Sequence, residues 1–185
     1  MAKALVNLQK HPMKIKWTNV TVNTFKALAP HTKGALKFVF ANRDILSPLV
    51  KKVLTLADSM TNALVRTTFA PTMLWGANAR NILPNEVRVN LNTRIMTGET
   101  DKDVIKHLKK VCGKNVEVVT AAYTAPTPVS DITCHGYRML EQTISEVFEN
   151  TVALPYMFIA ASDARFYSPV SDNVFRFAPF VNGKD

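Results

Sequence analysis

The residues best suited to chemistry lie near the end of the chain, in "SDAR", where one residue separates Asp163 from Arg165. The apolar run "VALPYMFIA" precedes them, and "VFRFAPF" follows within ten residues. We interpret the run as a buried strand and "SDAR" as the turn at its carboxyl end, where open α/β sheets bind ligands. An arginine there could hold a carboxylate in a bidentate fork. Alternatively, Asp163 and Arg165 pair with each other and serve only the structure.

Residues 63–120 predict an antiparallel sheet with helices packed on one face. Residues 63–75 are rich in β-branched and aromatic side chains, and residues 86–96 alternate strictly, so each segment predicts a strand. A third strand is expected at "VEVVT", residues 116–120. The alternation places five residues on the buried face of the second strand: Val87, Val89, Leu91, Thr93 and Ile95.

Between these strands, "GETDKDVIKHLKKVCG" predicts a helix that carries its own boundary signals. Thr100 can cap the first turn, Asp101 and Asp103 suit the positive end of the helix, and Gly113 can take the left-handed position that ends it. Its apolar stripe should face the sheet: Val104, Ile105, Leu108, Val111 and Cys112.

Helices are also expected before this sheet. "MAKALVNLQKHP" places Ala4, Leu5 and Leu8 on one helical face and ends at Pro12, but it begins without a capping residue. Residues 21–58 predict two or three short helices separated by proline and glycine.

A Pro-containing, nearly uncharged stretch at 121–131 predicts a linker. Ser130 or Asp131 could cap the helix that follows, and the strands expected at 153–160 and 173–180 complete an α/β pattern. The apolar stripe of that helix is expected to consist of Tyr137, Leu140, Ile144, Val147 and Phe148.

The composition is that of a globular chain, with 47% apolar and 20% charged residues among 185. Cys112 and Cys134 match no metal or redox spacing, so both are expected to be core thiols. We find neither a signal peptide nor a transmembrane segment and take the cytoplasm as the default compartment. Of the formal charge of +9, residues 1–60 carry +8. That excess could attract an anionic surface, or it could be ordinary solvated helix faces.

Three motifs in this order, "GANARNILPNEVRVNLNTR", "SDARFY" and "FRFAPF", resemble the zinc-dependent metallopeptidase and aminoacylase family. That family includes carboxypeptidase S, bacterial glutamate carboxypeptidase and aminoacylase. The chain is most similar to the carboxypeptidase S branch, through "MTNALVRTTFAPTMLWGANARNILP". The resemblance covers essentially the whole chain.

The resemblance implies a dizinc catalytic α/β domain with an inserted lid or dimerisation domain. Residues 1–120 would be an α+β lid lacking its first strand and carrying a helical insert at 17–60, and residues 121–185 a partial catalytic segment. The family takes its zinc ligands from a His-x-Asp motif, an acidic pair and a late His. None of the four His residues here begins such a motif. We therefore expect this chain alone to bind no zinc and to hydrolyse nothing.

Three positions carry over from the resemblance as substrate-binding residues. Asn81 in "NILP" and Arg94 in "LNTR" match lid residues that hold the carboxylate end and the amide of the substrate in relatives. Arg165 in "SDAR" matches an arginine of the catalytic domain. The usual Gly-Gly-Thr before Asp-Ala-Arg is replaced here by Ala-Ala-Ser, residues 160–162.

Two functions follow. The first is a part of a dizinc hydrolase that cleaves a peptide or N-acyl amide next to a free carboxylate and pairs with a second copy through the lid. The second is a non-catalytic module that binds a partner through its lid edge or its basic first third. We do not expect nucleic acid as the partner, because residues 61–185 are close to neutral.

Overall fold

The structure is a computed structural model that describes residues 1–32, 62–158 and 162–177. These residues form two compact units. The first unit contains residues 1–18 and 62–126. The second unit contains residues 19–32, 127–158 and 162–177.

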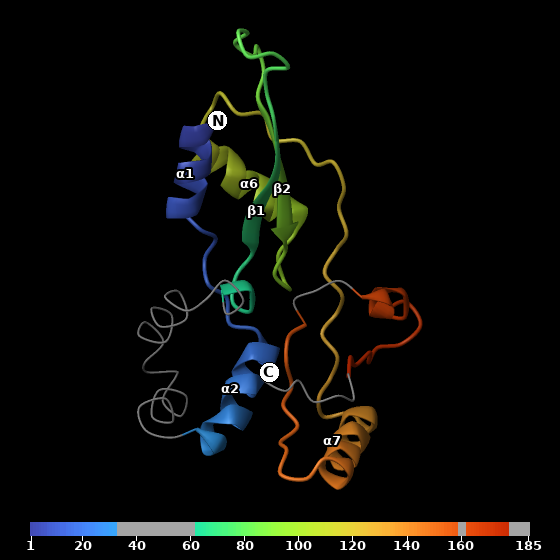
Figure 1. Cartoon of the computed structure of the whole chain (residues 1–185). Helices are drawn as coiled ribbons and strands as arrows, with labels where there is room; N and C mark the ends of the chain where they lie inside the picture. Colours follow the sequence, from blue (N-terminus) through green and yellow to red (C-terminus); the bar gives the residue numbers. More distant parts are fainter. Residues whose placement is uncertain (33–61, 159–161, 178–185) are drawn as a thin grey trace. The chain divides into compact units, whose positions relative to one another are not determined.

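The first unit is built on a hairpin of two antiparallel strands, β1 (Thr68–Trp75) and β2 (Arg88–Arg94) (Figure 1). The register runs from Thr68 opposite Arg94 to Trp75 opposite Arg88, and it shifts between Pro71 and Met73. A proline has no N–H to donate to the ladder, so a break in register beside Pro71 is expected. Both predicted strands are confirmed, although each is shorter than the sequence pattern.

Two helices, α1 (Ala2–Lys10) and α6 (Asp101–Cys112), pack with the hairpin around one core. Leu8 of α1 and Val104 and Leu108 of α6 form its buried centre. Partly buried residues of both strands pack against that centre, among them Phe69 and Leu91. The predicted α+β arrangement with an amphipathic helix against the sheet is therefore confirmed for this unit.

The ends of α6 form as the sequence predicted. The Asp103 backbone N–H donates to the Thr100 hydroxyl at 3.4 Å, and the Thr100 backbone N–H donates to the Asp103 carboxylate at 2.9 Å. This capping box satisfies donors that the first turn leaves without helical partners. Gly113 follows the helix with a φ of 94°, a conformation that favours glycine.

The third predicted strand is wrong, because residues 116–120 pair with no strand in the described part of the chain. The segment still alternates as a strand would: Val118 packs against the core, and Val119 is 75% exposed. Alternation of apolar and polar residues predicts which side of a segment is buried. It does not report whether a neighbouring backbone is present to form a ladder.

The second unit contains helix α2 (Asn19–Leu28), the 3-10 turn η1 (Ala29–His31), helix α7 (His135–Val147) and the 3-10 turn η2 (Asp163–Phe166). The first of the helices predicted within 21–58 is thus confirmed, and the rest of that segment lies outside the described residues. The Thr24 hydroxyl contacts the carbonyl of Pro155, which ties α2 to the chain after α7. No described helix has the length and apolarity needed to cross a bilayer.

Helix α7 is capped differently from the prediction. Neither Ser130 nor Asp131 is its N-cap; the Cys134 sulfur accepts the Tyr137 backbone N–H at 3.4 Å. The Asp131 carboxylate instead accepts the backbone N–H of Thr133 at 2.8 Å, a bond within the loop that precedes α7. The helix stripe is half-buried at Tyr137, Leu140, Ile144 and Phe148, but Val147 is 65% exposed, which corrects its assignment to the buried stripe.

The α/β pattern expected for the last third is not present in the described residues. Residues 153–158 and 173–177 belong to no helix or strand, and the ends of both expected strands lie outside the described residues. Pro155 interrupts the first run, and a proline inside a run disfavours a central strand. Residues 173–177 instead place aromatic rings on α7, with Phe175 5.5 Å from Tyr137 and Phe177 6.3 Å from Phe148 between ring centroids.

Candidate functional site

Asn81 and Arg94 lie at different ends of the hairpin. Asn81 is exposed in the loop between Trp75 and Arg88, which is the connection at the far end of β1. Arg94 is the last residue of β2 and stands opposite Thr68, where β1 begins. The length of β2, at about 3.3 Å per residue, puts roughly 20 Å between these ends. The chain turns in the loop that contains Asn81, and β2 then runs away from this loop to Arg94. Within one chain the two side chains are therefore kept apart by the length of β2.

Arg165 belongs to the second unit, where it lies in the exposed turn η2. Its guanidinium carbon is 4.6 Å from the ring centroid of Phe166, the next residue. Asp163 is the first residue of the same turn. The turn that the sequence predicted at "SDAR" is therefore present, although no strand leads into it within the described residues.

A shallow hollow at the loop end of the hairpin is lined by Trp75, Gly76, Asn78, Glu86 and Arg88. Arg88 donates to both carboxylate oxygens of Glu86, at 2.6 and 3.0 Å. This contact holds the pKa of the Glu86 carboxyl below its usual range and raises the pKa of Arg88. The Arg88 guanidinium is thus held by a carboxylate of its own hairpin.

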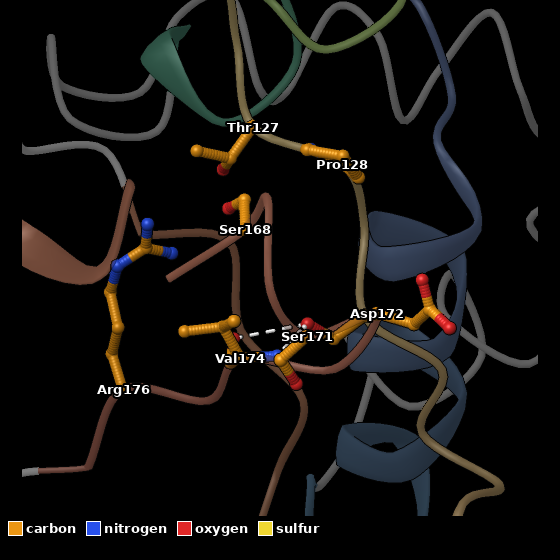
Figure 2. A pocket seen from close by; sticks show the side chains of 8 residues that line it. Thr127, Pro128, Ser168, Ser171, Asp172, Val174 and Arg176 are labelled. Carbon is orange, nitrogen blue, oxygen red and sulfur yellow. Dashed lines mark hydrogen bonds between the residues drawn. The ribbon is translucent and has the colours of Figure 1, made fainter. Parts of the chain in front are cut away.

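A second hollow, in the second unit, is lined mainly by hydroxyl side chains and one arginine (Figure 2). Arg176 reaches toward the space that Thr127 and Ser168 border (Figure 2). The sequence reasoning did not select Arg176. The signal was present in "VFRFAPF", where a lone cation stands between two aromatic residues of an apolar run. The full lining comprises Thr127, Pro128, Ser130, Ser168, Ser171, Asp172, Val174 and Arg176.

The metal that the resemblance implies does not fit the described residues. They contain no group of three or more His, Cys, Asp or Glu side chains able to hold an ion. Two histidines make structural contacts instead: a ring nitrogen of His11 is 2.9 Å from the Asn7 carbonyl, and one of His107 is 2.8 Å from the His11 carbonyl. His107 also stacks on Phe69 with 5.9 Å between ring centroids.

Residues 1–119 match the peptidase dimerisation domain of the M20 peptidases. The chain therefore belongs to this family, as its motifs predicted. The match covers all helices and strands of the first unit and also α2 of the second.

Individual relatives match both units. The chain is 28% identical over 183 residues to a protein of Dictyostelium discoideum named probable carboxypeptidase S-like 2, covering 98% of this chain and 35% of that protein. It is 29% identical over 184 residues to the human N-fatty-acyl-amino acid synthase/hydrolase PM20D1, covering 97% of this chain and 36% of that protein. The chain thus spans about a third of the length of these curated relatives. No solved structure matches it significantly.

Proposed function

We propose that this chain is the dimerisation and substrate-positioning part of a hydrolase that cleaves a peptide or N-acyl amide bond next to a free carboxylate. The observation that carries the proposal is the dimerisation-domain match over residues 1–119. The names of the two relatives, a carboxypeptidase-like protein and an N-fatty-acyl-amino acid synthase/hydrolase, support the choice of substrate class. The dizinc centre and the general base that the family resemblance implies belong, in this proposal, to other segments of a full-length protein.

The end of the hairpin supports a role in pairing two copies. Met73, Leu74 and Trp75 at the end of β1 are 54%, 63% and 48% exposed. Ile82 and Leu83 in the connecting loop are 59% and 91% exposed. Neighbouring large apolar side chains left in water are typical of a protein–protein contact surface. We assign this apolar hairpin end, residues 73–75 with 82–83, to the homodimer interface.

The separation of Asn81 and Arg94 gives dimerisation a second role in the proposal. Both side chains suit an N-acyl amino acid, since an amide can donate to and accept from the substrate amide and a guanidinium can hold the carboxylate. They lie at opposite ends of one hairpin, so they contact the same small substrate only where a second copy supplies one of them. Dimerisation would then complete the binding site.

Kinetics on the native full-length protein test this assignment. We expect turnover of an N-acyl amino acid and little turnover of the matching C-terminal amide, which has no carboxylate. Arg94→Lys should lower kcat/KM by roughly tenfold, because Lys cannot form the planar two-point contact. Arg88→Lys is the matched control, since it makes the same change on the same strand and should leave kcat/KM nearly unchanged. Equal turnover of acid and amide, or equal effects of the two variants, would refute the proposal.

A further inference from the structure

We infer that the hydroxyl-lined hollow of the second unit, which we call the Arg176 pocket, binds a small carboxylate. The choice of N-acyl amino acids as test ligands rests on the proposed function, which assigns the substrate carboxylate to Arg94 of the first unit; the inference itself concerns a carboxylate site within the second unit. The inference makes Arg176, rather than Arg165, the carboxylate-binding arginine of this unit.

The wall of the Arg176 pocket is fixed by contacts between two segments far apart in the sequence. The Ser130 hydroxyl donates to the Val174 carbonyl at 3.0 Å and accepts the Val174 backbone N–H at 2.8 Å. The Asp131 backbone N–H donates to the Asn173 side chain at 2.6 Å. These bonds join residues more than forty positions apart, so the segment that leads into Arg176 is held against residues 130–131. A preformed site loses less entropy when it binds a ligand.

Arg176 is oriented by two contacts that leave its terminal nitrogens for a ligand. Its Nε donates to the Ser162 hydroxyl at 2.8 Å, and its guanidinium carbon lies 5.4 Å from the centroid of the Phe158 ring. The cation–π contact occupies one face of the guanidinium, and the hydrogen bond occupies its Nε edge. The two terminal NH₂ groups, which form the fork that matches a carboxylate, take part in neither contact.

The other side chains of the pocket suit a small anion. Thr127 and Ser168 project into the same space as the Arg176 guanidinium, and their hydroxyls can each donate to an anionic oxygen (Figure 2). Asp172 is the one acidic residue of the lining, and its carboxylate lies well away from the guanidinium (Figure 2). The space between Arg176, Thr127 and Ser168 is therefore positive and rich in donors, whereas a cation site would need carboxylates or carbonyls facing it.

Arg165 lacks these features. Both arginines are exposed and each lies over an aromatic ring, but Arg165 lies over the ring of its own neighbour, Phe166, and does not line the Arg176 pocket. Arg138, an exposed arginine of α7 in the same unit, does not line the pocket either and serves as the control for Arg176.

Nuclear magnetic resonance on the 185-residue chain, with ¹⁵N-labelled arginine, tests the inference directly. The Nε–H signal of Arg176 should shift saturably with acetate and with N-acetylglycine, and it should not shift with N-acetylglycinamide, which has no carboxylate. Inorganic phosphate serves as a second oxyanion. Saturation by phosphate with no response to either carboxylate would overturn the assignment, and so would a non-saturable drift with every ligand.

Variants separate the pocket from a general salt effect. Arg176→Gln should weaken acetate binding, followed by backbone signals of residues 127–130, by about tenfold or more. Arg138→Gln, at an exposed arginine of α7 that does not line the pocket, should leave it unchanged. Ser168→Ala removes a pocket hydroxyl without touching the Ser162 contact, so it should weaken binding severalfold even if Arg176→Gln disturbs the fold. Unchanged acetate affinity in both Arg176→Gln and Ser168→Ala would overturn the inference.

The two experiments test the Arg176 pocket and the proposed function independently. If the full-length protein hydrolyses N-acyl amino acids while acetate leaves Arg176 unaffected, the proposed function stands and the Arg176 pocket is wrong. If acetate and N-acetylglycine bind while the full-length protein hydrolyses no such substrate, the pocket stands as a carboxylate site and the proposed function is wrong.

Discussion

The Lys16 ammonium lies 3.1 Å from a carboxylate oxygen of Glu99, whose side chain is only 4% exposed. The other carboxylate oxygen accepts the hydroxyl of Thr67, which is itself 1% exposed. Lys16 also donates its backbone N–H to the Val65 carbonyl at 2.8 Å. This contact joins three separate segments of the first unit around one buried charge, which must be paired to be tolerated there.

Replacing the ammonium should therefore destabilise the first unit. We expect Lys16→Met to lower the free energy of unfolding by about 2 kcal/mol, because the buried carboxylate keeps only its neutral hydrogen-bond partner. Urea unfolding followed by circular dichroism measures the difference. Lys14→Met makes the same change in charge at an exposed position two residues away and should cost little. Equal losses in the two variants would mean that Lys16 acts only through net charge.

The capping box of α6 should make stability depend on pH. Hydrogen bonds from the Thr100 backbone and hydroxyl lower the pKa of the Asp103 carboxyl. A lowered folded-state pKa means that the stabilisation is fully present above the unfolded Asp pKa of about 3.9 and is lost as the pH falls through the folded value. Asp103→Asn should be less stable than the wild type at neutral pH, and the difference should shrink as the pH falls below the unfolded Asp pKa of about 3.9 and through the lower folded value.

Asp101→Asn is the control for this pH effect, since it removes a carboxylate from the same helix end but no member of the capping box. Unfolding free energies measured at several pH values give the comparison. A stability gap between wild type and Asp103→Asn that stays constant down to the lowest pH would contradict the capping-box explanation.

The apolar hairpin end should control the oligomeric state. Leu74→Asp places a charge where Leu74 is 63% exposed, and we expect it to weaken dimerisation at least about tenfold, because burying a carboxylate in an interface is costly. Light scattering coupled to gel filtration across a range of protein concentrations measures this. Val119→Asp changes a 75%-exposed valine outside the hairpin and should leave the dimer intact. A wild-type chain that is monomeric at every concentration would remove the dimer assignment for this chain.

Cys112 should react slowly with thiol reagents. Burial raises the pKa of the Cys112 thiol, so less of the reactive thiolate is present at a given pH than for an ordinary thiol. In Cys134→Ser, where Cys112 is the remaining cysteine, alkylation should fall below that of a free thiol and rise only above the ordinary pKa of about 8.5. The serine should still cap α7, because serine is a favoured N-cap residue. Rapid alkylation at neutral pH would show that Cys112 is neither buried nor shifted.

Several local features were predictable because neighbours in the sequence decide them. The boundaries of α6 follow from Thr100, Asp103 and Gly113, whose preferences act within one turn of the helix. The buried sides of α1 and β2 follow from periodicity, which sorts side chains between two faces without reference to the rest of the fold. The motif resemblance supplied the family and selected Asn81, Arg94 and Arg165, whose roles remain predictions.

Other features depend on what meets each segment in space, and the sequence alone did not determine them. Residues 116–120 alternate like a strand, but a ladder requires a second backbone beside them, and only the tertiary structure shows that the described residues provide none. The distance between Asn81 and Arg94 likewise follows from the hairpin, since thirteen residues can span either a tight turn or the length of a strand. The Arg176 pocket unites residues more than forty positions apart, a proximity that hydrogen bonds between distant segments create and that no local pattern encodes.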